Sequence, residues 1–347
     1  MPDLQRIAID AMGGDGGVEV MLAGASLALK AQSDLHFLLV GDEPQIKSAL
    51  GQHTALAAVS QILHVEAVVS GDEKPSRETL RRARDTSMGR AVHAVKAKEA
   101  GAAVSAGNTG MLMAMAKLSL RTLPGIDRPA LAAMLPTLGE NDVVMLDLGA
   151  NTECDANNLV EFALMGAAYA RTGMGIERPR VALLNIGTED QKGVDSIRIA
   201  AQILRDAPDL PLQFCGYIEG DKLSRGDVDV VVHDGFSGNI ALKTIEGTAR
   251  FVTDLLRRAF TSSTRSKIGF LISRPATELL RHHLDPNNHN GALFLGLNGL
   301  VLKSHGSANA KGVANAIHVA AELLHKDILG QVEQDMADLH HAQTGAG

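Results

Sequence analysis

Apolar runs of strand length that end in glycine-rich turns are the feature that most constrains the fold of this chain. Five of these turns combine glycine with Asp, Asn, Ser or Thr. They are Ile9–Asp15 (IDAMGGD), Val104–Gly110 (VSAGNTG), Leu146–Asn151 (LDLGAN), Leu184–Thr188 (LNIGT) and His233–Asn239 (HDGFSGN). Glycine lets the backbone approach a ligand closely, and exposed N–H groups can hold an anion. We therefore expect one composite site for an anionic substrate beyond the carboxyl ends of the strands.

Helix-like stretches separate the apolar runs. Examples are Met21–Ala31, Met88–Lys98 and Asn158–Arg171. The strand-like runs cover residues 7–9, 37–40, 62–65, 102–104, 143–146, 181–184 and 228–232. The alternation predicts βαβ units and therefore an α/β fold, a three-layer αβα arrangement around a mostly parallel sheet. We expect residues 1–334 to form a single domain and residues 335–347, where small and polar residues prevail, to form a flexible tail.

One segment differs from the rest in charge. Between residues 250 and 281 seven Lys or Arg residues face only Asp254 and Glu278, although the whole chain has a net charge of −7. Leu and Phe residues alternate with these cations, which predicts two basic amphipathic helices joined at residues 261–264. Such an element binds an anionic membrane surface or an acidic protein. A charged helix pair that packs on the sheet or on another subunit explains the same pattern.

Composition excludes several classes of function. The net charge of −7 and an aromatic content of 3%, with no Trp, argue against nucleic-acid binding. The two cysteines, Cys154 and Cys215, provide neither a disulfide framework nor a metal-binding pair, and no His, Cys or Asp cluster has metal-ligand spacing. The first residues lead directly into a strand, and no uncharged apolar run could span a bilayer. We expect a cytoplasmic protein without a metal or other cofactor.

The usual catalytic motifs are absent as well. The chain lacks a phosphate-binding GK[ST] loop, a GxGxxG sequence after a strand, and the GxSxG sequence that marks a serine nucleophile. Gly107–Gly110 instead begins a helix, so its amides lie at a positive helix terminus where Asn108 and Thr109 could bind substrate oxygens. A simple N-cap explains the polar residues equally well. Lys192 and Lys243 follow two other turns, although a single lysine is usually a solvated surface charge.

Five other residues have a possible structural and a possible functional interpretation. Asp10 and Asp147 end apolar strands, where a carboxylate needs either hydrogen bonds from loop amides or a functional role. Organising the turns is the role we expect of them. Cys154 is expected to be a small buried residue rather than a nucleophile. His305 is the histidine expected to donate a proton or a hydrogen bond to the substrate, whereas His233 lies in a strand and is expected to be structural.

The ordered set of turns resembles the bacterial phosphate acyltransferases. The matching segments, in chain order, are IDAMGGD at residues 9–15, PSR at 75–77, VSAGNTG at 104–110, DRPA at 127–130, LDLGAN at 146–151, VALLNIG at 181–187, Lys192–Gly193, DGFSGN at 234–239 and KSHGSA at 303–308. Each segment alone is a weak signal, but together they extend over nearly the whole chain. Residues 261–277 match the family only loosely, and His289 stands where the family pattern has an aromatic residue.

This resemblance implies a reaction, partners and a location. The family transfers a fatty acyl group from acyl carrier protein to inorganic phosphate, and the acyl phosphate then feeds a membrane-bound glycerol-3-phosphate acyltransferase of phospholipid synthesis. Its fold is similar to that of phosphate acetyltransferases and the isocitrate dehydrogenase group. Its members are homodimers that associate peripherally with the inner face of the membrane. The implied reaction agrees with the residues, because phosphate is itself a nucleophile and positioning alone supplies much of the rate.

We assign candidate roles on this basis. The catalytic candidates are Asn108, Lys192, Asn239, Lys243 and His305. The candidates for binding phosphate or substrate are Gly13, Gly14, Asp15, Ser105, Gly107, Thr109, Gly110, Asp147, Asn151, Asn185, Gly187, Asp234, Gly235 and Gly238. The candidates for contact with carrier protein or membrane are Arg257, Arg258, Arg265, Lys267 and Arg274.

Three alternatives share parts of this pattern. A phosphate acetyltransferase would use the same anion-holding turns with a coenzyme A thioester as donor. A metabolite-binding protein would use the fold without turnover. A dehydrogenase would share the fold class, but the dinucleotide fingerprint is absent. A series of acyl donors on carrier protein and on coenzyme A distinguishes the first alternative.

Overall fold

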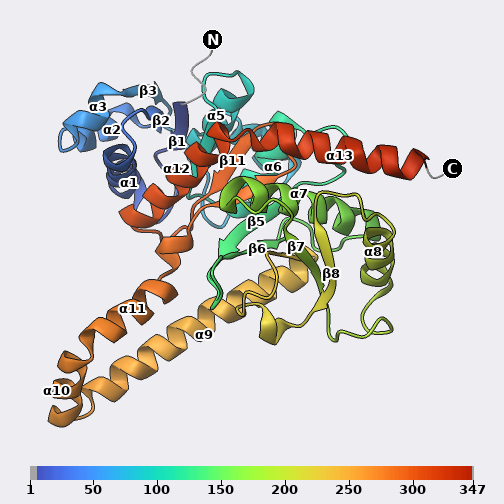
Figure 1. Cartoon of the computed structure of the whole chain (residues 1–347). Coiled ribbons are helices and arrows are strands. Elements are labelled where there is room, and N and C mark those ends of the chain that lie inside the picture. The colour runs from blue at the N-terminus through green and yellow to red at the C-terminus, as the bar shows by residue number, and fades with distance from the viewer. Residues whose placement is uncertain (1–5, 346–347) are drawn as a thin grey trace.

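The computed structural model describes residues 6–345 and has alternating strands and helices (Figure 1). The strands are β1 (Arg6–Asp10), β2 (His36–Gly41), β3 (Ser60–His64), β4 (Ala102–Ser105), β5 (Ala130–Leu135), β6 (Val143–Leu146), β7 (Arg180–Leu184), β8 (Gln213–Ile218), β9 (Val230–Val232), β10 (Ala292–Leu295) and β11 (Leu300–Lys303). The helices are α1 (Gly17–Ala31), α2 (Glu43–Leu50), α3 (Thr54–Ala58), α4 (Arg77–Ala83), α5 (Ser87–Lys96), α6 (Thr109–Leu120), α7 (Ala156–Met174), α8 (Asp195–Arg205), α9 (Gly235–Thr261), α10 (Thr264–Ile272), α11 (Arg274–Leu284), α12 (Ala310–His325) and α13 (Ile328–Gly345), with 3-10 turns η1 (Gly220–Lys222) and η2 (Pro286–His289).

All strands join one sheet in the order β3-β2-β1-β4-β11-β10-β5-β6-β9-β7-β8. The strands on either side of the centre are parallel to their neighbours, as the sequence predicted. The three central pairings, β11 with β10, β10 with β5, and β5 with β6, are antiparallel. Three reversals make β6, β9 and β7 run opposite to β1, β4 and β11.

This reversal restricts where the expected composite site beyond the carboxyl ends of the strands can lie. The turns after β1, β4 and β11 lie at one side of the sheet, where these strands end. The turns after β6, β9 and β7 lie at the opposite side, because these strands run in the opposite direction. We call them the first-edge and second-edge turns. Only a site that extends across the central strands β10 and β5 can be reached from both sets.

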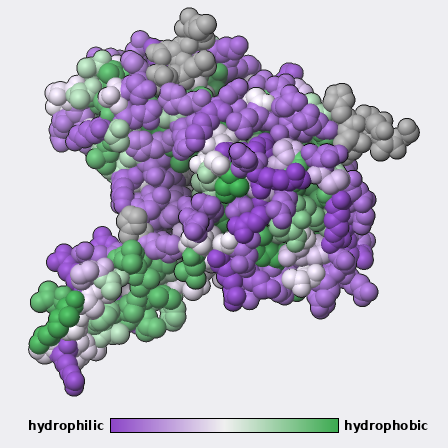
Figure 2. All heavy atoms as spheres, viewed as in Figure 1, coloured by the Kyte–Doolittle hydropathy of each residue, from purple (hydrophilic) through white to green (hydrophobic). Residues whose placement is uncertain are grey.

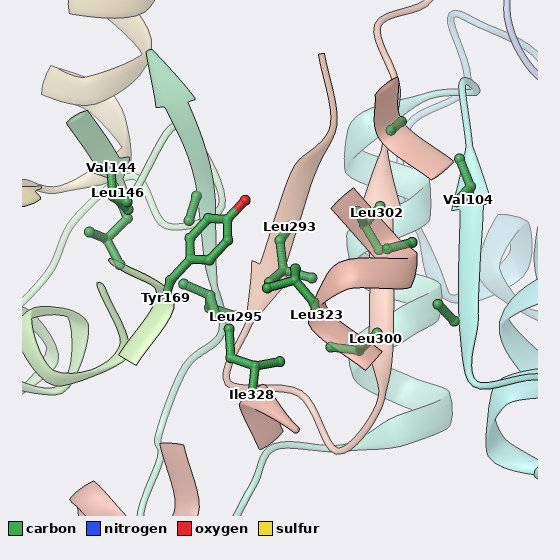
Figure 3. Packing of buried hydrophobic residues seen from close by; sticks show 14 of the residues in the cluster. Val104, Val144, Leu146, Tyr169, Leu293, Leu295, Leu300, Leu302, Leu323 and Ile328 are labelled. Atoms are coloured by element: carbon green, nitrogen blue, oxygen red, sulfur yellow. The ribbon is translucent and has the colours of Figure 1, made fainter. Parts of the chain in front are cut away.

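Helices cover both faces of the sheet and create two cores. One face packs against α1, α7, α12 and α13 and includes Ile9, Val104, Leu293 and Leu302. Figure 3 shows Tyr169 of α7 beside Leu293, Leu295 and Ile328 in this core. The other face includes Ala103, Val301 and Phe294 and packs against α5 and α6. Successive strand residues point to opposite faces, so the single sheet serves both cores. The three-layer α/β arrangement is confirmed.

Helices α9, α10 and α11 form an arm that extends away from the body (Figure 1). The sequence predicted two helices here, joined at residues 261–264. The structure has the break at Ser262–Ser263, but Ser273 separates a third helix whose first turn contains Pro275. Proline is suited to the first turn of a helix and cannot continue one. Figure 2 shows apolar residues gathered on the arm, where Phe251, Leu271 and Leu279 are exposed.

The C-terminal residues differ from the expected flexible tail. Helix α13 continues to Gly345, and Asp335, Met336 and Leu339 are buried against the body. The Arg171 guanidinium pairs with the Asp335 carboxylate, which joins this helix to α7. Residues 346–347 lie outside the described residues. Among residues 6–345, none of the helices combines the length and apolar character that a membrane span requires.

Candidate functional site

A cavity of about 770 Å³ lies between the two sets of turns, over the central strands. Apolar side chains of β5, β10, α6 and α9 form most of its wall, and polar groups come from the turns and from the arm. The apolar lining residues are Met113, Leu131, Ala133, Leu135, Pro136, Leu148, Ala150, Leu242, Ile245, Ala249, Leu284, Pro286, Ala292 and Phe294. The volume and the mixture of an apolar wall with a few polar groups are typical of a small-molecule site.

The first-edge turns interlock closely. A Cβ atom on Gly13 would lie 2.9 Å from the Gly107 nitrogen, so only glycine allows the turns after β1 and β4 to meet. The Asp15 N–H donates to the Gly306 carbonyl at 2.8 Å, which joins the turn after β11 to the same group. The Ser105 hydroxyl donates to the Asp10 carboxylate at 2.6 Å and accepts from the Gly107 N–H at 3.1 Å. Burial raises the pKa of Asp10.

Lys303 is the cation of the first edge. It ends β11, lines the cavity and is partly buried. Its ammonium group donates to the Ala106 carbonyl at 3.2 Å and to the Ser304 carbonyl. Desolvation lowers the pKa of Lys303 to about 8, and the nearby Asp10 and Asp15 oppose that shift. Two carbonyls use two of the three ammonium hydrogens, so one hydrogen is available to an anion in the cavity.

His305 lies two residues further on and also lines the cavity. The backbone N–H of His305 donates to the Asn290 side-chain oxygen at 2.9 Å. The ring Nδ1 of His305 accepts from the backbone N–H of Ser307 at 3.2 Å. Desolvation lowers the pKa of His305, which favours the neutral ring. Because a backbone N–H can only donate, the neutral ring must carry its proton on Nε2. His305 is thus suited to donate a hydrogen bond from Nε2.

The second edge is organised around Asp147. Its carboxylate accepts from the N–H groups of Leu131, Gly149, Ala150 and Asn151, and from the Asn151 side-chain amide, at 2.6–3.2 Å. Burial still raises the pKa of Asp147. Five donors occupy this carboxylate, as expected for a residue that shapes the turn. The result agrees with the structural role that the sequence favoured.

Helix α9 begins against the same turn. Asp234 caps it through the Ser237 N–H at 2.7 Å, and a Cβ atom on Gly238 would lie 2.3 Å from the Asp147 carbonyl. Glycine at this position allows the helix to start directly on the turn. His233 is fully buried and its Nδ1 lies 3.1 Å from the Asp234 carbonyl. Burial lowers the pKa of His233 to about 4, so it stays neutral and structural.

The first turns of α9 bring polar groups across the cavity towards the first edge. Asn239 and Lys243 both line the cavity, one helical turn apart. The Asn239 amide donates to the Leu148 carbonyl at 3.0 Å, which orients its side-chain oxygen and remaining hydrogen. Lys243 pairs with Glu246 at 2.9 Å, and its charge contributes to the lowered pKa of Lys303. Lysines from both edges therefore influence one another.

Asn108 and Thr109 have different positions. The Asn108 oxygen accepts from the Met111 N–H at 3.0 Å, which makes Asn108 the N-cap of α6. Its amide donates to the carbonyls of Gly71 and Glu73, at 2.8 and 3.2 Å, and so fastens the preceding loop. Thr109 and Gly110 line the cavity beside it. The N-cap interpretation is confirmed for Asn108, and substrate binding by Thr109 stays a prediction.

Lys192 belongs to the second edge but lies on an exposed loop after β7. The Asn185 amide donates to the Lys192 carbonyl at 3.2 Å, and Gly193 at φ 85° allows the loop to fold back onto Asn185. Gly187 packs against the stem of Lys192. Lys192 is not part of the cavity lining in this structure. Catalytic contacts often form only in the substrate complex, so this position does not remove it from consideration.

The structure thus divides the predicted site residues into two groups. Those that line the cavity are Thr109, Gly110, Asn239, Lys243, His305 and the arm residue Arg257. Those that support or flank it are Gly13, Gly14, Asp15, Ser105, Gly107, Asn108, Asp147, Asn151, Asn185, Gly187, Lys192, Asp234, Gly235 and Gly238. The remaining arm residues, Arg258, Arg265, Lys267 and Arg274, are exposed outside the cavity.

Sequence reasoning did not assign six charged residues of the lining to the site, namely Glu246, Arg250, Asp254, Arg281, Asp285 and Lys303. Lys303 stood within the recognised KSHGSA segment, where a cation directly after an apolar strand could have identified it. Glu246 and Arg250 follow Lys243 at helical spacing, a pattern that could have been extended. The Glu246 carboxylate pairs with Lys243 at 2.9 Å and with Arg250 at 3.9 Å.

Two further properties restrict the chemistry. Burial raises the pKa of Cys154 to about 12, so its thiol stays protonated and is not an activated nucleophile. Among residues 6–345 no group of three or more His, Cys, Asp or Glu is arranged to hold a metal ion. The groups available at the cavity include the carboxylates of Glu246, Asp254 and Asp285 as well as cations, amides and His305. The cations and amides suit binding and polarisation of an anionic or carbonyl substrate.

Comparison with known proteins places these features in a family. The sequence model of the family described as fatty acid synthesis protein matches residues 5–331. The phosphate acyltransferase of Erythrobacter litoralis is 68% identical over 336 residues, which are 97% of this chain and 94% of the relative. The phosphate acyltransferase of Rhodospirillum rubrum is 49% identical over 331 residues, 95% of this chain and 94% of the relative.

Solved structures support the fold at much lower identity. A phosphotransacetylase from Streptococcus pyogenes is 20% identical, with a TM-score of 0.60 over 92% of this chain and 94% of that chain. A phosphotransacetylase from Staphylococcus aureus is 17% identical, with a TM-score of 0.59 over the same shares. These likenesses confirm a phosphotransacetylase-like α/β fold. Together with the near-complete sequence matches, they show that the chain belongs to the phosphate acyltransferase family and is an acyltransferase.

Proposed function

We propose that this acyltransferase moves a fatty acyl group from an acyl carrier protein thioester to inorganic phosphate. A phosphate oxygen attacks the thioester carbonyl carbon, the carbon–sulfur bond breaks, and the carrier thiolate takes up a proton. The products are an acyl phosphate and the free carrier thiol. The single observation that supports this reaction best is an apolar cavity with Lys303, Lys243 and His305 gathered at its polar end.

The residues of that end divide the work in this proposal. Lys303 and Lys243 hold the phosphate, and Thr109 and Asn239 supply hydrogen bonds that orient it. His305 donates from Nε2 to the oxygen that becomes negative in the tetrahedral intermediate. A preorganised donor of this kind contributes roughly 3 kcal/mol to the lowering of the barrier. Lys192 completes the phosphate site from the second edge when substrate is bound.

No covalent intermediate on the protein is part of this mechanism. Phosphate at neutral pH is already a nucleophile, and the protonated Cys154 thiol offers none. The enzyme therefore accelerates the reaction by fixing phosphate against the carbonyl and by stabilising the developing charge. Correct alignment of two reactants can contribute about 7–11 kcal/mol. The leaving thiolate takes up its proton from solvent water, because the neutral His305 ring is a hydrogen-bond donor and not an acid of sufficient strength.

The arm provides the surface for large partners in this proposal. Arg258, Arg265, Lys267 and Arg274 are exposed on it, beside exposed apolar residues such as Leu271 and Ile272. Cations attract an acidic carrier protein or an anionic lipid, and the apolar side chains can enter a lipid interface. We therefore propose a cytoplasmic homodimer that contacts the inner membrane face peripherally and passes acyl phosphate to a glycerol-3-phosphate acyltransferase.

A second candidate function is acyl transfer from coenzyme A. It is favoured by the phosphotransacetylase structures that this fold resembles. Both reactions use the same phosphate site and differ in the group that carries the thioester. The cavity of about 770 Å³ with its largely apolar lining favours a fatty acyl group over an acetyl group.

The test uses the purified chain with long-chain acyl-acyl carrier protein and labelled inorganic phosphate. Hydroxylamine then traps acyl phosphate as the hydroxamate. We expect a labelled product that hydroxylamine destroys, and more of it from the carrier protein than from acyl coenzyme A. Product from acyl coenzyme A alone would transfer the assignment to the second candidate. Absence of product from either donor would overturn both.

A further inference from the structure

Two alanines lie side by side on the cavity floor, next to Lys303. Ala292 of β10 is the cross-strand partner of Lys303 on β11. On the other side, β10 pairs with β5 so that Leu293 is opposite Ala132, which places Ala133 beside Ala292. Both alanines line the cavity. A row of small side chains therefore leads from the cationic end across the two central strands.

Larger apolar side chains enclose this row. Phe294 and Leu131 form the next cross-strand pair on the same face, because side chains two residues apart point the same way. Leu242 and Ile245 of α9 and Met113 of α6 line the same cavity and pack against the core on this face. The row is thus the low part of an apolar channel rather than an isolated gap.

The size of the two side chains keeps the channel open. Neighbouring strands lie roughly 4.8 Å apart, so a leucine at either position would project directly over the other. The same face carries Ala8, Ala103 and Ala182 elsewhere, but those alanines are fully buried in the core, whereas Ala133 and Ala292 line the cavity. Apolar surface left without packing contacts loses dispersion energy. An apolar hollow that opens beside a lysine therefore suits a ligand with a charged or polar head and an apolar chain.

We propose that Ala292 and Ala133 form the floor of the binding site for a long unbranched alkyl chain, and that their small size sets the chain length accepted. This inference rests on the proposed function, because the thioester carbonyl must lie near Lys303 for the chain to follow the row. The chain then replaces water over the two strands. Each methylene group buried there contributes about 0.8 kcal/mol.

The test compares donors of two chain lengths in variants of the floor. For Ala133→Leu and Ala292→Leu we expect kcat/KM with hexadecanoyl-carrier protein to fall about 50-fold, since several methylene groups lose their place. With butanoyl-carrier protein we expect a change within about threefold. The matched control is Ala58→Leu, the same change on an exposed helix. Equal losses with both donors, at unchanged melting temperature, would overturn the inference.

A binding measurement makes the test independent of turnover. Hexadecanoate binding to the full chain is measured by calorimetry for the original protein and for each variant. We expect about tenfold weaker binding in Ala133→Leu and unchanged binding in Ala58→Leu. Unchanged affinity in both floor variants would reject the channel even if acyl phosphate forms. Weaker affinity without any acyl phosphate from the original protein would retain the channel and reject the proposed reaction. Ala133→Val replaces the leucine variant if that protein melts early.

Discussion

The two edges of the sheet use the same kind of turn for different purposes. At the second edge Asp147 accepts five hydrogen bonds from the turn that it organises. At the first edge Asp10 accepts from Ser105 and lies near the Lys303 ammonium, which lines the cavity and donates to two carbonyls. A carboxylate whose acceptor sites are filled by donors of its own turn is structural. A carboxylate beside a partly buried cation raises the pKa of that cation.

The lysines of the two edges differ in the same way. Lys303 is held by two carbonyls on the cavity wall, so it is in position before substrate arrives. Lys192 is exposed on a loop and must lose side-chain freedom when it meets phosphate. A preorganised group gives more stabilisation per contact than one that has to be ordered. We therefore expect the first edge to hold the phosphate more strongly.

Replacement of Lys303 gives the largest expected effect. In Lys303→Met we expect kcat/KM for phosphate to fall about 100- to 1000-fold, since a preorganised cation in a partly dry cavity is lost. Initial rates at varied phosphate measure this. Lys30→Met on the exposed side of α1 is the control and should keep the original rate. A change below threefold in Lys303→Met would place the phosphate elsewhere.

Asp147→Asn tests whether the carboxylate of the second edge has a structural role. The variant replaces one carboxylate oxygen by an NH2 group, which cannot accept from the N–H groups that point at it. We therefore expect a free energy of unfolding about 3 kcal/mol lower. Urea unfolding at neutral pH measures it. Asp10→Asn should cost less stability, because the Asp10 carboxylate accepts from the Ser105 hydroxyl whereas the Asp147 carboxylate accepts from five donors. Equal losses in the two variants would show that both carboxylates are structural.

The alkaline pH dependence sharpens the comparison. The pKa of Lys303 is lowered to about 8, so its cation is lost as pH rises through that value. We expect kcat/KM for phosphate to fall about tenfold per pH unit above pH 8. Asp10→Asn removes a negative charge that raises the pKa of Lys303, so the fall should begin at lower pH. Lys303→Arg should shift it upward; an unshifted profile in both variants would assign it to another group.

The same lysine predicts a change in stability of the opposite sign. Its folded-state pKa lies below the ordinary value of 10.5, so between pH 8 and 10.5 the unfolded chain binds more protons than the folded chain. The contribution of Lys303 to stability therefore rises with pH in this window, while phosphate affinity falls. Urea unfolding of the original protein and of Lys303→Met across the window separates the two trends.

Lys192 tests how far the second edge takes part. In Lys192→Met we expect about a tenfold fall in kcat/KM for phosphate, smaller than in Lys303→Met, because a mobile contact is lost. Steady-state kinetics on both variants gives the ratio. A loss as large as that of Lys303→Met would mean that the two edges hold phosphate equally. No loss at all would remove Lys192 from the site.

The smallest expected effect concerns Asn108. Its removal in Asn108→Ala takes away the cap of α6 and the two bonds that fasten the preceding loop, so we expect about 1 kcal/mol lower stability. We also expect a fall of a few fold in rate through the displaced Thr109. Thermal unfolding and kinetics measure the two effects. A normal rate would remove Asn108 from the catalytic candidates.

Much of the fold could be predicted because its signal is local. Each of the seven apolar runs contains or overlaps a strand, and the alternation with helices gives the layers. The runs at β5 and β10, ALAAML and ALFL, were not recognised, since short stretches of Ala and Leu carry no β-branched residues. These are the antiparallel strands that reverse the sheet. The opposed edges therefore could not be predicted, because direction depends on pairing between residues far apart in sequence.

Prediction of the candidate site from the sequence had the same limit. Three of the five turns contribute lining residues, from the segments 104–110, 146–151 and 233–239. The turn at 9–15 packs against the turn after β4 and does not itself line the cavity. The turn at 184–188 follows β7, which lies on the far side of β9 from β6. Lys303 was missed although its segment was recognised, because its burial and its partners depend on the packing of three turns. Local motifs therefore identified the turns, and only packing decides which atoms face the cavity.

A crystal structure of the protein grown with inorganic phosphate tests the central claim most directly. We predict one phosphate in the cavity, within hydrogen-bond distance of Lys303 Nζ and of the Asn239 amide. Phosphate bound only outside the cavity, or a cavity that stays empty of phosphate at concentrations that support turnover, would contradict the account.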